Sequence, residues 1–202
     1  MPDDIYSERP LFGGAISSII FNRFMDASNF RQVPDHQEVF VDPERDESLI
    51  FELLDYKHDV PDEGSASWFL HDLAAEQDAG DFVLVEQSIA VEIPNIQCLN
   101  SPAIATSAVG QMSISKGRQG REAQNIVKVF VANIRLKGVA TDVLITAYEP
   151  IAINPLSESA RVVGAGLTTP ALQSGITSMA DAFKLAVSSF KVHDWALFGG
   201  PV

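Results

Sequence analysis

The sequence predicts an α+β fold in which layers form around a central antiparallel β-sheet. Runs of alternating or nearly continuous apolar residues recur along most of the chain, and such runs are typical of strands. Two of them meet at Lys137-Gly138, a short connection typical of an antiparallel hairpin. Two longer stretches, residues 62–77 and 178–192, place apolar side chains at helical spacing. Many strands with few helices indicate an α+β domain.

The first elements follow a glycine pair. Gly13-Gly14 predicts a turn, because glycine tolerates backbone conformations that other residues avoid. The β-rich run 15–21 after it predicts a strand. Residues 26–32 are typical of a short helix, with Asp26 or Ser28 as its N-terminal cap.

The next elements carry most of the acidic residues. Residues 37–41 predict a strand. Residues 46–57 contain a nearly continuous apolar run that suits either a buried strand or a buried helix, and the close preceding turn favours the strand. The helix predicted over 62–77 has Ser65 or Ser67 as its candidate cap.

The second half alternates regular and irregular stretches. Residues 81–93 predict a strand that breaks near Ser88, and residues 125–151 predict the two strands of the hairpin. Residues 95–122 and 153–177 are rich in Pro, Gly, Ser and polar side chains, so we expect irregular loops there.

The composition indicates one packed domain over residues 1–202. Hydrophobic residues make up 46% of the chain and charged residues 20%, which is too apolar for a disordered protein. Cys98 is the only cysteine, so an internal disulfide is excluded and a reducing compartment is expected. No apolar run approaches the ~18 residues of a membrane span, so we expect no membrane insertion. We also expect a monomer.

Negative charge is concentrated in the first half of the chain. The net charge is −13, with 21 acids and 5 bases in residues 1–100 but 6 acids and 9 bases in residues 101–202. Eleven of the acids lie within residues 35–63, opposed only by Arg45 and Lys57. Such a surface repels nucleic acid and anionic membrane and attracts a basic protein. Solubility alone explains acidic residues but not this asymmetry.

Motifs for catalysis or metal binding are weak. The four histidines form no zinc-binding spacing, and no phosphate-binding glycine loop or serine-hydrolase elbow occurs. We therefore expect no metal and no cofactor. Glu52 and Asp55 are the one enzyme-like pair, because two carboxylates can act as acid and base. A helix would place them on one face, whereas a strand would place them on opposite faces.

Four segments of the sequence are distinctive: "LFGGAISSII", "DASNFRQVPDHQEVFVD", "ESLIFELLDY" and "FKVHDWALFG". Together they resemble one known family, the Mog family of Ran guanine nucleotide release factors. The similarity is dense over the N-terminal part of the chain and returns in the hairpin and the last helix, so it extends over the whole domain. It is weakest across the two irregular stretches.

The resemblance implies a single-domain α/β/α sandwich with a central antiparallel sheet flanked by helices, similar to the photosystem protein PsbP. It also implies binding to the small GTPase Ran, release of bound guanine nucleotide and a part in nuclear protein import, in nucleus and cytoplasm. Such a protein acts by binding and is not an enzyme. By motif position, the family's partner-binding acids correspond to Asp35 and Glu38 in "VPDHQE" and to Glu52 and Asp55 in "ELLD".

Other interpretations remain open for the same residues. Asp35 follows a proline and is also typical of a turn, and Glu38 also suits an exposed strand position. The acidic face also fits an adaptor that binds another basic protein in trafficking. The pair Glu52 and Asp55 leaves a carboxylate hydrolase as a third hypothesis.

Overall fold

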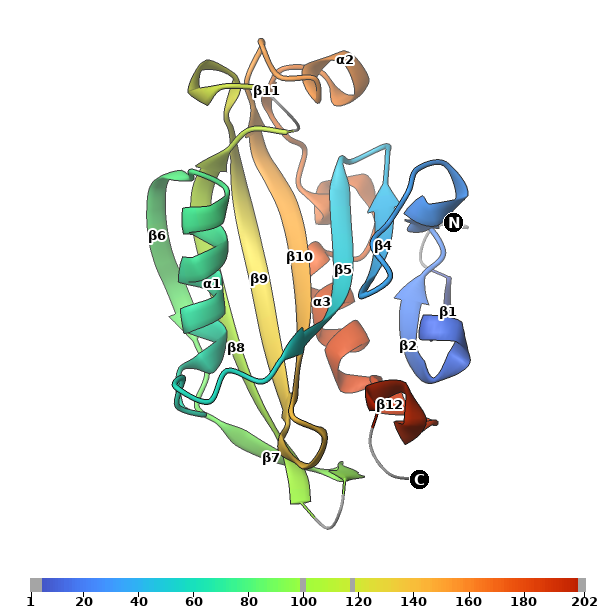
Figure 1. Cartoon of the computed structure of the whole chain (residues 1–202). Coiled ribbons are helices and arrows are strands. Elements are labelled where there is room, and N and C mark those ends of the chain that lie inside the picture. The colour runs from blue at the N-terminus through green and yellow to red at the C-terminus, as the bar shows by residue number, and fades with distance from the viewer. Residues whose placement is uncertain (1–4, 99–100, 117–118, 200–202) are drawn as a thin grey trace.

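A nine-stranded antiparallel sheet forms the centre of the computed structural model, which describes residues 5–98, 101–116 and 119–199 (Figure 1). Its strand order is β3-β4-β5-β10-β9-β8-β6, with β7 also on β8 and β11 also on β10. The strands are β3 (Met25–Asp26), β4 (Gln37–Asp42), β5 (Glu47–Asp55), β6 (Gly80–Gln87), β7 (Val91–Cys98), β8 (Ser101–Ile114), β9 (Asn125–Leu136), β10 (Thr141–Ile153) and β11 (Gly166–Leu167).

Helices cover both faces of this sheet, which confirms the predicted α+β layers. Helix α1 (Ser65–Glu76) packs on β8, β9 and β6. On the other face, α3 (Met179–Ser188) lies between β10 and a small sheet in the order β1-β2-β12 (Figure 1). The small sheet consists of β1 (Tyr6–Leu11), β2 (Ile16–Phe21) and β12 (Lys191–Val192), and a third helix is α2 (Ala160–Val163). Within the described residues, no helix has the length and apolar character needed to cross a bilayer.

Strand alternation builds two apolar clusters, one on each face. On β9, the side chains of Val129 and Val131 pack with Leu70 of α1. The intervening Phe130 packs with Phe183 of α3, their ring centroids 5.6 Å apart. The sheet is therefore buried on both sides at β9, although the alternation in its sequence predicted a strand without showing that both faces are covered.

The helix starts differ in how they are capped. The side chain of Asp26 accepts a hydrogen bond from Ser28 N at the short 3-10 turn Ala27–Asn29, as predicted. The prediction of a serine cap for α1 is wrong, because Gly64 occupies the cap position without a side-chain bond. Ser65 instead makes a buried hydrogen bond with Thr106 of β8, with 2.8 Å between the two hydroxyl oxygens.

The predicted irregular loop over 95–122 is wrong for most of its length. Residues 101–114 form the long strand β8, paired with β9 on one side and with β6 and β7 on the other. Residues 99, 100, 117 and 118 lie outside the described residues. The second stretch, 153–177, holds only α2, the two-residue strand β11 and a 3-10 turn.

Small side chains explain why β8 was not predicted as a strand. The strand is rich in Ala, Ser and Gly, which are weak strand formers. They allow α1 to approach closely: a Cβ added at Gly110 would lie 3.0 Å from side-chain carbons of both Leu70 and Phe82. The small residues that let α1 pack closely on β8 therefore also make the sequence of β8 resemble that of a loop.

This packing predicts that Gly110→Ala lowers the free energy of unfolding by about 1–3 kcal/mol, because an added methyl group overfills the contact. Equilibrium urea denaturation measures the change. Ser113→Ala on the same strand is the control and should change stability by less than about 0.5 kcal/mol. Equal stability of Gly110→Ala and the wild type would contradict the close approach of α1.

Candidate functional site

Several acids of residues 35–63 serve the interior of the protein. Arg23 Nη1 donates to Asp42 Oδ2 at 2.8 Å and to Glu47 Oε2 at 2.6 Å, and all three side chains are at most 5% exposed. Arg45 Nε donates to the second Glu47 oxygen at 2.9 Å. Two acids that looked like surface charge in the sequence are therefore bound by arginines within the same chain.

Two further acids have basic partners from the second half of the chain. Asp46, in the β4–β5 turn, forms an ion pair with Lys116, which follows β8. Asp62 forms ion pairs with Lys137 and with Arg135 Nη1, the latter at 3.2 Å. Internal ion pairs thus reduce the acidic surface that remains for a partner.

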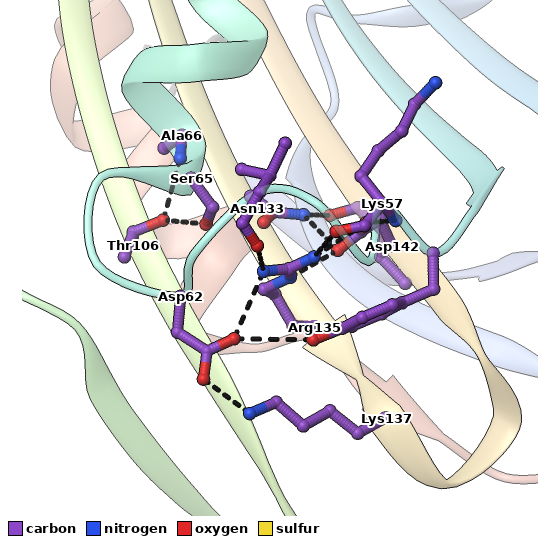
Figure 2. Close-up of polar contacts among 12 residues, drawn as sticks. Lys57, Asp62, Ser65, Ala66, Thr106, Asn133, Arg135, Lys137 and Asp142 are labelled. Atoms are coloured by element: carbon purple, nitrogen blue, oxygen red, sulfur yellow. Dashed lines mark hydrogen bonds and ion pairs between the residues drawn. The ribbon is translucent and has the colours of Figure 1, made fainter.

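A buried ion pair lies where the β9–β10 hairpin meets the loop after β5 (Figure 2). Arg135 and Asp142 face each other in the hairpin register, both side chains are fully buried, and Arg135 Nε donates to Asp142 Oδ1 at 2.9 Å. Asn133 Nδ2 donates to the same oxygen at 3.2 Å. A buried pair of this kind is tolerated only when its other polar atoms are also bonded.

The remaining bonds of this pair hold the loop of residues 56–62. Arg135 donates to the carbonyl oxygens of Val60 and Lys57, each at 2.6 Å, and Lys57 N donates to Asp142 Oδ2 at 2.8 Å. The ring of Tyr56 lies 4.1 Å from the Arg135 guanidinium carbon. The pair therefore fixes the chain that links the end of β5 to α1. This network was not predicted from the sequence, although the opposite charges of Arg135 and Asp142 on either side of the hairpin turn were a signal for it.

Glu52 lies in β5 on the face that carries α1. It is paired with Gln37 of β4, whose Nε2 donates to Glu52 Oε1 at 2.8 Å. His36 Nε2 lies 3.2 Å from the same oxygen. The Glu52 side chain is 22% exposed, so one carboxylate oxygen is held while the group still reaches solvent.

Asp55 lies at the exposed end of β5. Because successive side chains of a strand alternate, Asp55 and Glu52 point to opposite faces of the sheet. This separation removes the one-face geometry that an acid and base couple requires, so the structure disfavours the carboxylate hydrolase hypothesis. Within the described residues, no cluster of His, Cys, Asp or Glu is arranged to hold a metal ion.

Asp35 and Glu38 lie together near the small sheet. Both line an open hollow of about 430 Å³ that also includes Asp26 and Leu197. Glu38 Oε1 accepts a hydrogen bond from Phe12 N at 2.6 Å, so this carboxylate helps to hold the turn after β1. Since Glu38 pairs with Phe51 of β5, it faces the side opposite Glu52. The structure thus brings Asp35 and Glu38 together but not all four predicted acids.

We call five of the remaining acids the acidic rim: Asp35, Glu38, Glu52, Asp55 and Asp59. Glu44 and Glu63 are also exposed but are not counted in it. Asp35, Asp55 and Asp59 are exposed. Within the described residues, no basic side-chain nitrogen lies within 4.0 Å of their carboxylate oxygens. The rim follows the start of β4, the end of β5 and the loop held by Arg135. Exposed acids without internal counter-charges suit a basic partner.

Tyr148 of β10 lies opposite Ser48 of β5, on the same face as Glu52. Burial raises the pKa of Tyr148 to about 12, a hydrogen bond from Gln77 opposes this rise, and the negative charges of Glu52 and Glu76 add to it. The phenol is therefore neutral and keeps its hydrogen at physiological pH.

The fold and the rim define a small α+β domain with an acidic surface suited to a basic protein. A family model described as Ran-interacting Mog1 protein matches residues 9–150, well over half of the chain, so the chain belongs to this family. The matched range contains the whole acidic rim.

Individual relatives agree with this assignment. The chain is 38% identical over 157 residues to a Ran guanine nucleotide release factor of Danio rerio, covering 75% of this chain and 82% of the relative. It is 31% identical over 200 residues to a probable Ran guanine nucleotide release factor of Dictyostelium discoideum, covering 96% and 97%. The crystal structure of the Saccharomyces cerevisiae Ran-binding protein Mog1p superposes with a TM-score of 0.64 at 22% identity, covering 96% and 98%, and supports the fold.

We predict that Asp142→Ala lowers the free energy of unfolding by about 3–5 kcal/mol, because it leaves the Arg135 charge buried without its partner. Urea denaturation measures the loss. Asp72→Ala, which removes an exposed acid of α1, should cost less than about 0.5 kcal/mol. Equal losses in the two variants would show that the buried pair is not a main support of the fold.

The environment of Tyr148 predicts a late alkaline titration. The folded pKa of about 12 lies above the ordinary value of about 10, so the phenol contributes stability below pH 10 that is lost as pH rises towards 12. The phenolate absorbance of the wild type minus that of Tyr148→Phe isolates this group. A difference curve with its midpoint near 10 in folded protein would contradict the desolvation of the half-buried Tyr148 phenol.

Proposed function

We propose that this protein binds the GTPase Ran, promotes release of its guanine nucleotide and supports nuclear protein import. The observation that carries the proposal is the family match over residues 9–150, which includes the acidic rim, together with relatives named Ran guanine nucleotide release factors. The protein acts by binding rather than by catalysis, as a monomer, in nucleus and cytoplasm. It binds neither nucleic acid nor membrane, in keeping with its net charge of −13.

Release by binding follows from thermodynamic linkage. A GTPase holds its nucleotide through a lysine, backbone amides and Mg²⁺ around the phosphates. If the acidic rim binds the empty GTPase more tightly than the loaded one, nucleotide affinity must fall by the same factor. A tenfold effect on affinity requires about 1.4 kcal/mol of differential binding. No covalent step by this protein is needed.

Within the rim, Glu52 and Asp55 are the principal contacts of this proposal, and Asp35 and Glu38 flank them. Glu52 is pre-oriented by Gln37 and His36, which lowers the entropic cost of presenting its charge. Asp55 follows directly from β5 into the loop that Arg135 holds, so its backbone is fixed although its side chain is exposed. Asp35 and Glu38 add charge to a hollow in which a basic side chain of the partner can lie.

A second candidate is an adaptor that uses the same rim to bind another basic protein. The exposed acids without internal counter-charges support this function as well. The two differ in outcome: an adaptor binds a basic protein without changing the nucleotide affinity of Ran.

The deciding experiment mixes purified protein with Ran that carries a fluorescent guanine nucleotide. We expect faster loss of fluorescence as protein is added, and a stable complex with nucleotide-free Ran in size-exclusion chromatography. Ran alone and Ran with the Glu52→Lys variant are the controls. Unchanged release together with no complex would contradict the proposed function.

Charge reversal tests the rim. We predict that Glu52→Lys and Asp55→Lys each weaken Ran binding by about 1–3 kcal/mol, because each places a positive charge against a basic partner. Isothermal titration calorimetry measures the change. Glu86→Lys, which reverses an exposed acid of β6, is the matched control, because β6 lies at the opposite edge of the sheet from β4 and β5 (Figure 1). Equal affinity of all three variants would place the contact elsewhere.

A further inference from the structure

The sheet face that carries Glu52 is only partly covered. Helix α1 packs on β6, β8 and β9, and Figure 1 shows β5 and β10 beside it without a helix in front of them. Along β5, Ser48, Ile50, Glu52 and Leu54 share this face by strand alternation, and each is half-buried. An uncovered, partly apolar face therefore continues from the acidic rim along β5.

A hollow of about 280 Å³ opens in this face, between β5, β10 and the C-terminal end of α1. Apolar side chains of Ile50, Ile114, Val127 and Pro150 line part of it. Its volume lies just below the range of about 300–1,000 Å³ usual for ligand pockets, which suits a single large side chain better than a cofactor. The hollow begins two residues along β5 from Glu52, so one partner can reach both.

Two polar groups that line the hollow have unused hydrogen-bonding capacity among the described residues. Asp46 Oδ2 is buried without a hydrogen-bond partner, while the other oxygen of the carboxylate pairs with Lys116. The Tyr148 hydroxyl accepts a bond from Gln77 at 2.8 Å, and its own hydrogen has no acceptor within the described chain. A buried acceptor without a donor is costly, so an incoming group that donates to Asp46 gains affinity.

We propose that Ran inserts one large side chain into this hollow, with its apolar body against Ile50 and Val127 and its donor tip at Asp46. The inference rests on the proposed function and identifies the hollow as the anchor of the same interface. Tyrosine, tryptophan and arginine combine an apolar body with a donor tip, and these are the residues enriched at the centres of interfaces. The Tyr148 hydroxyl donates to a carbonyl oxygen beside the inserted side chain.

This arrangement separates two tasks within one surface. The rim attracts the basic partner over a distance and raises the association rate, while the hollow slows dissociation because a buried anchor must leave it. Changes in the rim should therefore alter association and its salt dependence, and changes in the hollow should alter dissociation.

Ser48→Trp tests the hollow, because the indole fills the space without changing charge. We expect Ran affinity to fall about tenfold or more, mainly through faster dissociation in surface plasmon resonance. Ser113→Trp is the matched control, since Ser113 is also a half-buried strand serine but faces the other side of the sheet. It should change affinity by less than about twofold.

Tyr148→Phe provides a second test that does not depend on whether the tryptophan variant folds. It removes only the hydroxyl, and we expect a smaller increase in dissociation rate with association unchanged. Circular dichroism and the urea midpoint establish that each variant is folded. If the wild type binds Ran while folded Ser48→Trp and Tyr148→Phe bind equally well, the hollow is not the anchor. If the wild type itself does not bind Ran, the proposed function fails first.

Discussion

The buried pair of Arg135 and Asp142 is the interaction on which the candidate site depends. The five N–H groups of the guanidinium are matched by five contacts, to Asp142, Asp62 and two backbone carbonyl oxygens. Those carbonyls belong to Lys57 and Val60, in the loop between β5 and α1. Without this donor, the buried Val60 carbonyl would lose the bond from Arg135, and the Lys57 carbonyl would keep only the turn bond from Val60 N. The loop would then lose its position. The backbone positions of Asp55 and Asp59 on either side of Lys57 therefore depend on a charge that is itself fully buried.

An apolar pair at positions 135 and 142 would pack in the core but would not hold the loop of residues 56–62. Replacing a buried ion pair with well-packed apolar residues is often neutral or favourable for stability. Such residues, however, offer no donors to the carbonyls of residues 57 and 60, so they would leave this irregular segment unsupported. The pair therefore fixes the backbone of the loop more than it adds net stability. Acids presented from a loop need such a fixed backbone.

Periodicity in the sequence predicts the strands and helices that pack large side chains, such as β5, the β9–β10 hairpin, α1 and α3. It fails at β8, where small residues serve the close approach of α1. The number of acids in the sequence overstates the acidic surface for another reason. Arg23 binds Asp42 and Glu47, residues 19 and 24 positions away, and no local pattern reveals such pairing. The sequence thus shows where charge is dense, whereas the fold decides which charges remain for a partner.

Strand alternation places Glu52 and Asp55 on opposite faces, yet one partner can contact both. The ladder between β4 and β5 ends at Gln37 and Glu52. Among the described residues, the bond from Leu53 N to His36 O is the last backbone bond between the two segments. Beyond it, Leu54 and Asp55 pair only with β10, so β5 becomes the edge of the sheet. In the proposed interface, a partner bound at this edge would meet one acid on each face, and the hollow on the α1 side would fix its direction of approach.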